Sequence, residues 1–205
     1  MKKTLTMVLA LVLVAAISVG ATLAYLTSTD KVVNTFTVGN VAITLDEAKV
    51  DANGKALTGE AAERVKANSY KLMPGHTYTK DPIVHVSSDS EDCYLFVKVT
   101  NEIAAIEDEN STVAAQMARN GWTLIDENNG IYVYGTNNAL TKVSKNANVP
   151  VFSTFKIAGT VTNDELKAYN GETIVVNAYA IQADGFADKT ASEIWTEANF
   201  HIPGS

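Results

Sequence analysis

The chain has 205 residues, 46% of them hydrophobic, and a formal net charge of −7, which suits one domain with an apolar core. The acidic balance argues against a nucleic-acid-binding protein, because phosphate backbones need a basic patch that this sequence does not offer. Cys93 is the single cysteine, so no intramolecular disulfide can form. Its place in the apolar run CYLFVKVT favours a core residue over a reactive thiol.

Residues 1–24 have the pattern of a secretory signal peptide. Lys2 and Lys3 supply a positive start, and residues 5–19 form an uncharged apolar run. That run is shorter than the 20 or so apolar residues of a membrane span and fits the core of a signal peptide. An uncleaved membrane anchor is the alternative.

Small residues mark the expected cleavage site. Thr22 and Ala24 occupy the positions where signal peptidase requires them, so we expect cleavage between Ala24 and Tyr25. Loss of the two leader lysines leaves 14 basic residues against 23 acidic ones in the mature chain, residues 25–205. We expect this mature chain to be secreted and not to span a membrane.

The mature chain begins with an unusually apolar tail, residues 25–35. Its large apolar residues are Tyr25, Leu26, Val32 and Val33. The tail either forms the first strand of its own fold or adds as a donor strand to an exposed sheet edge of another subunit. Because donor and acceptor surfaces differ, the second contact is heterologous and propagates into a filament. The residues alone leave both interpretations open.

The rest of the mature chain, residues 36–205, is predicted to be one β-domain. In residues 34–48 the apolar side chains alternate, with a shift of phase at Gly39 and Asn40 that is typical of a turn or bulge. Residues 121–136 read as a hairpin around the turn at 126–130. Further strands are expected in residues 81–88, 93–100, 149–161 and 171–184. Short strands between Gly, Asn and Asp clusters predict an all-β fold, an antiparallel sandwich or barrel.

Three short helical insertions are expected among these strands. Residues 58–70 open with a threonine and acidic residues, and residues 110–122 combine an Asn/Ser cap with a glycine stop. Residues 162–169 read as a short capped turn. Their charged faces indicate solvent exposure.

The sequence lacks the patterns of known catalytic sites. His76, His85 and His201 do not form the His-Glu-x-x-His spacing of zinc proteases. Serine-hydrolase elbows and phosphate-binding loops are also missing from the sequence. We therefore predict no enzyme, no cofactor and no metal site.

Acidic residues gather in three loops. They are Asp89, Glu91 and Asp92, then Asp126 and Glu127, and finally the run Asp51-x-Asn53-Gly54. The last run fails as a calcium loop, because such a loop needs glycine at its sixth position and glutamate at its twelfth. We interpret the clusters as solvated charges, with weak extracellular calcium binding as the alternative.

Two motifs give the chain a resemblance to a known family. After a leader that ends GATLAY, the pattern Phe-x-x-Gly-x-x-x-Ile is followed by LMPGHTYTKD. The matched positions are Phe36, Gly39, Ile43, Leu72, Pro74, Gly75, Thr79, Lys80 and Asp81. These features resemble the TasA/camelysin family of exported matrix proteins, whose leaders are processed by a SipW-type signal peptidase. The resemblance covers roughly residues 17–100.

This resemblance implies a jelly-roll-like β-sandwich at the cell surface or in the extracellular matrix. Subunits of the family assemble head to tail into biofilm fibres by exchange of an N-terminal donor strand, here within residues 25–33, and a minor accessory subunit can take part. Some relatives carry a metallopeptidase label, but this sequence has no zinc motif.

Two other functional classes remain as alternatives. One is a monomeric surface-associated binding module or adhesin that recognises a glycan or a host protein through aromatic side chains. Its candidate residues are Trp122, Tyr132, Tyr134 and Trp195, which at this spacing are more often core residues. The other is a secreted protease, which the missing motifs disfavour.

Overall fold

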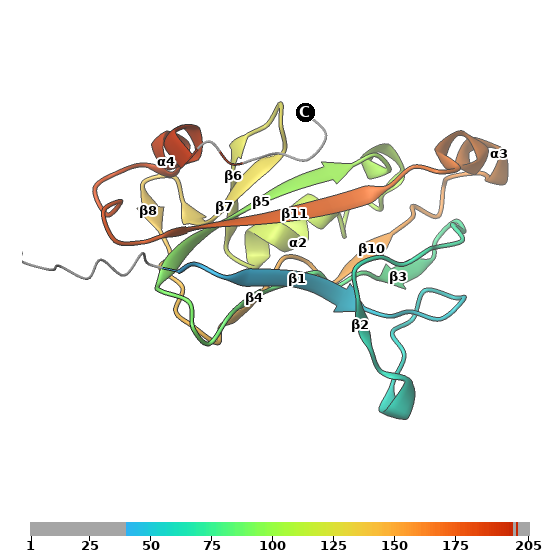
Figure 1. Ribbon diagram of the computed structural model, residues 1–205. Helices are drawn as coiled ribbons and strands as arrows, with labels where there is room; N and C mark the ends of the chain where they lie inside the picture. Colours follow the sequence, from blue (N-terminus) through green and yellow to red (C-terminus); the bar gives the residue numbers. More distant parts are fainter. Residues whose placement is uncertain (1–39, 199, 201–205) are drawn as a thin grey trace, which may run out of the picture. The chain divides into compact units, whose positions relative to one another are not determined.

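The computed structural model describes residues 40–198 and residue 200, which belong to one compact unit, Gly39–Ser205. Their fold is an antiparallel β-sandwich with short helices, as the sequence predicts (Figure 1). The strands are β1 (Ile43–Ala48), β2 (Arg64–Val65), β3 (Thr77–Thr79), β4 (Ile83–Val86), β5 (Cys93–Asn101), β6 (Trp122–Asp126), β7 (Ile131–Thr136), β8 (Ala139–Leu140), β9 (Asn148–Pro150), β10 (Thr154–Lys156) and β11 (Ile174–Gln182). The helical elements are η1 (Gly59–Ala61), η2 (Ala104–Ile106), α2 (Val113–Arg119), α3 (Asn163–Leu166), η3 (Lys167–Tyr169) and α4 (Ala191–Ala198).

Two sheets make up the sandwich. The first has the strand order β2-β1-β4-β9, and the second has the order β11-β5-β7-β6, with β8 paired to β7. β3 and β10 form a separate two-stranded ladder. Val84 of the first sheet and Leu95 of the second are fully buried in the same hydrophobic core. That main core joins the two sheets.

Strand β5 is buried on both faces. Its odd-numbered residues from Cys93 to Val99 belong to the main core, whereas Tyr94 and Phe96 belong to a second cluster with Ile194 and Trp195 of α4. The predicted alternation of β5 is confirmed. Helix α4, which covers the outer face of the second sheet, was not predicted.

Two of the three expected helical insertions are confirmed. In α2 the cap is Thr112, whose hydroxyl accepts a hydrogen bond from the N–H of Ala115, rather than the preceding Asn/Ser pair. In α3 the Thr162 and Glu165 side chains form a reciprocal capping box. Each cap satisfies N–H groups that a helix start leaves without a partner.

The predicted helix at residues 58–70 is wrong. The segment contains only the η1 turn, and its chain then pairs with β1 as β2. Gly59 has φ of +65°, which an α-helix through residues 58–70 could not include, and the N–H of Lys49 donates to the Glu63 carbonyl at 2.8 Å. Hydrogen bonding to β1 replaces the helix.

Most of the predicted strands are confirmed with shifted ends. The hairpin consists of β6 and β7, and Gly130 in its turn has φ of +64°. A Cβ there would lie 2.3 Å from the Val99 carbonyl oxygen, so this position requires glycine. The expected strand at residues 149–161 is instead divided into β9 and β10, with Val151 and Phe152 buried between them. The jelly-roll connectivity stays a prediction.

Candidate functional site: a groove between two sheet edges

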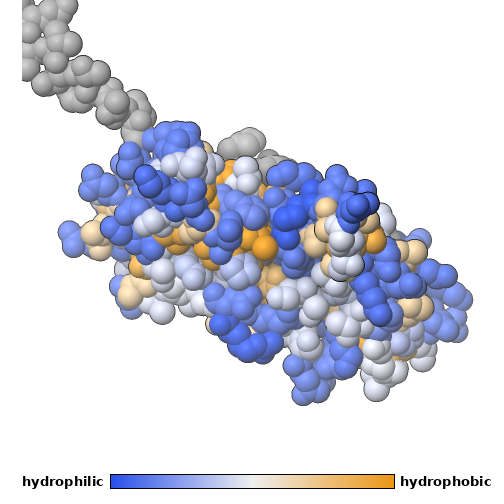
Figure 2. Space-filling view, turned by 90° about the horizontal axis from the view of Figure 1, so that it is seen from below, coloured by the Kyte–Doolittle hydropathy of each residue, from blue (hydrophilic) through white to orange (hydrophobic). Residues whose placement is uncertain are grey.

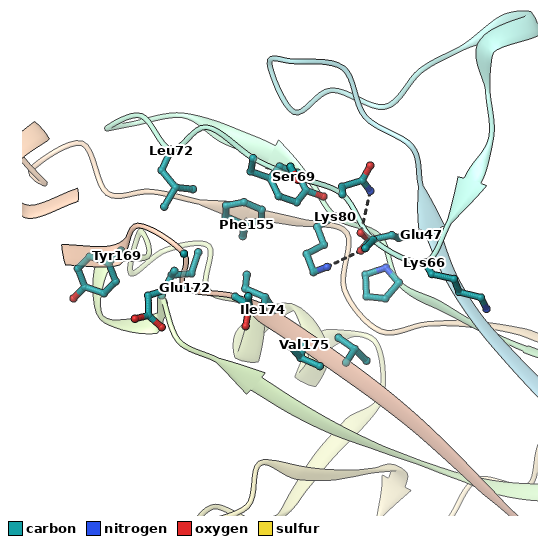
Figure 3. Close-up of a pocket in the computed structure, with 18 of the residues that line it drawn as sticks. Glu47, Lys66, Ser69, Leu72, Lys80, Phe155, Tyr169, Glu172, Ile174 and Val175 are labelled. Carbon is teal, nitrogen blue, oxygen red and sulfur yellow. Dashed lines mark hydrogen bonds and ion pairs between the residues drawn. The ribbon is translucent and has the colours of Figure 1, made fainter. Parts of the chain in front are cut away.

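A groove of 1370 Å³ lies between β1 and β11. Figure 3 shows Leu72 and Phe155 along one side, Ile174 and Val175 on β11, and the Glu47–Lys80 pair towards β1. The remaining walls come from residues 66–71 and 163–173. In Figure 2 hydrophobic residues gather in the middle of the visible face, and hydrophilic residues surround them. The apolar floor of the groove is formed by Leu72, Phe155 and Ile174, and polar side chains such as Lys66 and Glu172 also line it.

Strand β11 presents an unpaired edge to this groove. It pairs with β5 in continuous antiparallel register and is the end strand of its sheet. Glu102 N–H donates to the Thr173 carbonyl, and Ala183 N–H donates to the Asp92 carbonyl, so odd-numbered residues bond to β5. The backbone groups of Ile174, Val176, Ala178 and Ala180 therefore point away from β5, where no strand pairs with them in the described part of the chain.

Strand β1 presents a second such edge. β2 pairs only with Glu47 and Ala48, and β4 occupies the opposite side. Ser87 N–H donates to the Ala42 carbonyl, so the backbone groups of even-numbered residues bond to β4. The backbone N–H and C=O groups of Ile43 and Leu45 therefore point away from β4, whereas their side chains pack against the main core. At the outward carbonyl of Leu45, the ammonium of Lys66 donates a hydrogen bond.

An ion pair is buried beside the apolar floor. Lys80 Nζ lies 2.6 Å from Glu47 Oε2, and the two side chains are 12% and 5% exposed. Asn68 Nδ2 donates to the other carboxylate oxygen of Glu47 at 2.9 Å. Removal of either partner would leave a buried charge without compensation, so the pair holds loop 66–72 and the Lys80 segment onto β1.

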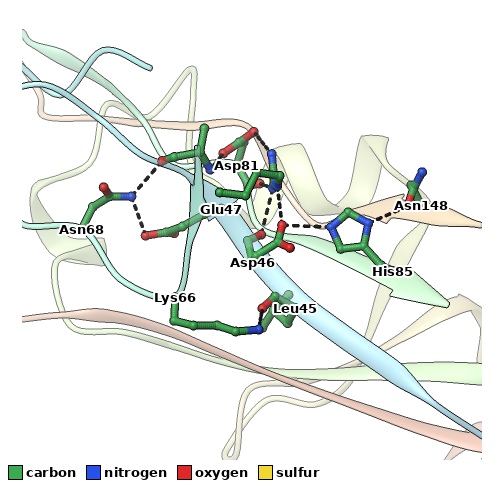
Figure 4. A network of polar contacts seen from close by, with 10 residues as sticks. Leu45, Asp46, Glu47, Lys66, Asn68, Asp81, His85 and Asn148 are labelled. Carbon is green, nitrogen blue, oxygen red and sulfur yellow. Dashed lines mark hydrogen bonds and ion pairs between the residues drawn. The ribbon is translucent and has the colours of Figure 1, made fainter. Parts of the chain in front are cut away.

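A second polar network lies on the outer face of the first sheet (Figure 4). Asp46 accepts from Arg64 and, at 2.9 Å, from His85 Nε2. Partial burial raises the pKa of Asp46, but the hydrogen bonds from Arg64 and His85 outweigh it and lower the pKa below its ordinary value. Asp81 accepts from Arg64 at 3.1 Å and from the N–H of Ala48 at 2.6 Å. These bonds fasten β2 and the residue after Lys80 to β1.

Of the motif residues named in the sequence, Leu72 and Lys80 line the groove. Gly75 completes a turn with φ of +71° in which Met73 O accepts from the His76 N–H. Thr79 pairs with Thr154 in the small ladder, and its carbonyl accepts from Tyr70 at 2.9 Å. Pro74 belongs to the same exposed turn as Gly75, and Ile43 begins β1. Lys80 and Asp81 make the two contacts with β1 described above.

Several predicted residues lie outside the described part of the chain. They are the leader residues 1–24 with Thr22 and Ala24, the donor-strand residues Tyr25, Leu26, Val32 and Val33, and the motif residues Phe36 and Gly39, together with His201. The cleavage site and the donor strand therefore stay predictions.

The described histidines and acidic loops have structural partners. His76 Nε2 contacts the Asn53 carbonyl at 2.9 Å, whereas His85 bonds to Asp46. Asp51 accepts from the N–H groups of Asn53 and Lys55, which closes the loop that resembled the start of a calcium site. Among residues 40–198 and 200, no group of three His, Cys, Asp or Glu side chains could hold a metal ion.

The aromatic candidates for a binding module pack against other aromatic rings or the main core. Trp122 is 2% exposed, and its ring lies 5.2 Å from that of Tyr134. Tyr132 packs against the main core, and Trp195 packs edge-on against Tyr179 in the second cluster. Their packing is that of core residues.

Lys66, the Glu47 side chain and the β11 edge belong to the candidate site but were not predicted from the sequence. The side chains of Ile43, Leu45 and Glu47 alternate along β1 and face inwards. This alternation was the sequence signal that could have indicated a buried Glu47. The edge position of β11 depends on sheet order, which strand patterns do not contain.

Comparisons with protein-family models, curated proteins and solved structures returned no match to this chain. Within the described ranges, no helix has both the length and the apolar character needed to cross a membrane.

Proposed function

We propose that this protein is a secreted structural subunit of cell-surface fibres or of a biofilm matrix. Subunits would assemble head to tail, with residues 25–33 of one copy occupying the groove between β1 and β11 of the next. The SipW-type signal peptidase would release the tail, and a minor accessory subunit could anchor or start the fibre. The proposal involves no catalytic residue.

The observation that carries this proposal is the groove between two unpaired sheet edges. Along β1 and β11, backbone groups that pair with no strand in the described residues can bond to an added strand, and the apolar floor can receive its alternate side chains. Leu72, Phe155 and Ile174 are the apolar walls available to those side chains. The predicted donor contains large apolar residues that fit such a floor.

The chain length also suits exchange between copies. Residues 34–39 separate the candidate donor from Asn40, where the described chain begins. Six extended residues span at most about 20 Å, so an exchanged donor would hold two neighbouring subunits close together. The motif resemblance to the TasA/camelysin family supports the same assembly.

Insertion between both edges would require a local opening. Neighbouring strands lie about 4.8 Å apart, so an inserted strand needs about 9.6 Å between its two partners. Cα atoms of β1 and β11 already approach within 8 Å of each other. A donor would therefore pair with one edge first and separate the strands afterwards, which predicts slow, seed-dependent assembly.

Negative-stain electron microscopy tests this function. The mature chain that begins at Tyr25 is compared with a chain that lacks residues 25–33, both concentrated and seeded, and circular dichroism verifies that both are folded. Fibres from the first chain alone are the expected result. Folded monomers from both chains would contradict the proposal and favour the binding-module alternative.

A further inference from the structure

Lys66 takes an unusual hydrogen-bond partner for an exposed lysine. It directly follows β2, at the point where the chain leaves β1 and begins to border the groove. Although Asp46 and Glu47 are close in the same wall, its ammonium donates to the Leu45 backbone carbonyl (Figure 4). The lysine thus contacts the edge of the sheet rather than a carboxylate.

The Leu45 carbonyl is an acceptor that an added strand would need. The backbone carbonyl of Leu45 points away from β4. β2 does not cover it, because β2 pairs with Glu47 and Ala48, which follow Leu45 on β1. A strand that extended this sheet would donate one of its own N–H groups to the same carbonyl. Lysines on edge strands are a general means of preventing unwanted strand pairing.

We propose that Lys66 guards the β1 edge against strand addition, and that a donor segment, residues 25–33 of a second copy, must displace its ammonium. This inference rests on the proposed function, which supplies the occupant. The ammonium competes with the donor N–H for one acceptor. When displaced, it enters water at the exposed rim, so the displacement is reversible.

The test compares four versions of the mature chain: wild type, Lys66→Met, Lys66→Arg and Lys71→Met. Methionine keeps the aliphatic stem of Lys66 but removes its charge and its donor, whereas arginine retains both. Lys71 lines the same groove, and its ammonium makes no hydrogen bond within residues 40–198 and 200, so Lys71→Met is a matched charge control. The probe is a fluorescent peptide of residues 25–38, with a scrambled peptide as its control, and its uptake is followed by anisotropy.

We expect Lys66→Met to take up the peptide about tenfold faster than wild type, as loss of one charged hydrogen bond allows. Lys66→Arg and Lys71→Met should stay within about twofold of wild type. Thermal unfolding verifies that all four chains are folded, which the exposed position of both lysines leads us to expect.

The outcomes separate this inference from the proposed function. If Lys66→Met and Lys71→Met took up the peptide at the same rate while the wild type formed fibres, the proposed role of Lys66 would be overturned and the fibre function would stand. Uptake by Lys66→Met without fibres from wild type would support the guard and contradict the fibre function. Binding no stronger than that of the scrambled peptide in all four chains would overturn both.

Discussion

The two edges of the five-stranded sheet differ in how they are protected. β6, at one edge, has five residues, and its register with β7 shifts between Leu124 and Asp126. Helices α2 and α4 both lie against it. β11, at the other edge, has nine residues in continuous register with β5 and borders the groove.

This difference indicates which edge is available to another chain. Short edge strands, bulges and covering helices are common ways to prevent strand addition, and β6 has all three. β11 is longer, its pairing with β5 has no bulge, and no strand pairs with its open side in the described residues. On the facing edge of β1, the exposed Lys66 donates a hydrogen bond to the Leu45 carbonyl. Within the described residues, the groove side is therefore the less protected of the two edges.

The largest expected effect is on the closed edge. Trp122→Ala should reduce the free energy of unfolding by about 3–5 kcal/mol, because it removes a buried ring and the indole hydrogen bond to the Pro150 carbonyl. Urea denaturation measures the change. Leu124→Ala on the same strand is the control, since that side chain is 42% exposed and should change stability by no more than about 0.5 kcal/mol. Similar losses for both variants would contradict the assigned role of Trp122.

A proline on the open edge should separate assembly from folding. Val176 directs its N–H into the groove, so Val176→Pro should slow seeded fibre elongation at least tenfold and reduce stability by only about 1 kcal/mol. Asn177→Pro is the matched control, because the N–H of Asn177 faces β5. That variant should lose about 3 kcal/mol or more. If Val176→Pro fibres elongated at the wild-type rate, the β11 edge would not be the edge that pairs with the donor.

A smaller effect concerns Glu107, which docks the start of α2. Burial raises the pKa of this carboxyl, against the opposing hydrogen bond from the Val113 N–H. The folded state therefore favours the protonated acid, and stability is highest below the ordinary glutamate pKa and falls as pH rises through the raised value. Glu107→Gln should flatten this pH profile.

At neutral pH we expect Glu107→Gln to stabilise the fold by about 1 kcal/mol, because one buried carboxylate oxygen of Glu107 has no partner among the described residues. Urea denaturation at a series of pH values measures it. Glu109→Gln, an exposed neighbour, is the control and should leave the profile unchanged. If both variants changed the pH dependence of stability equally, burial of Glu107 would not be its cause.

The smallest expected effect is on Cys93, at the start of β5. Burial raises the pKa of its thiol to about 11, and the residue is fully buried. Labelling with Ellman's reagent at mildly alkaline pH should be negligible in both monomer and fibre, and complete in denaturant. Faster labelling in fibres would indicate that assembly opens the sandwich at β5 as well as at the groove.

Local patterns were sufficient to predict much of this fold. Alternation in β5 correctly assigned Leu95 and Phe96 to opposite faces, and glycine-rich turn chemistry placed the β6–β7 hairpin. Helix α4 carried a missed signal, the Thr190–Glu193 capping box, in which each side chain bonds to the other residue's N–H. Residues 58–70 misled the prediction because helix-favouring composition counted for less than pairing with β1.

By itself, the sequence determined the fold class, because the period of two in its apolar residues is a property of each strand alone. The candidate site was decided only by tertiary structure. Glu47 and Lys80 are 33 residues apart, and β1 and β11 face each other from opposite ends of the described chain. Which strand becomes a sheet edge, and which lysine reaches that edge, depends on contacts between distant segments that no local pattern records.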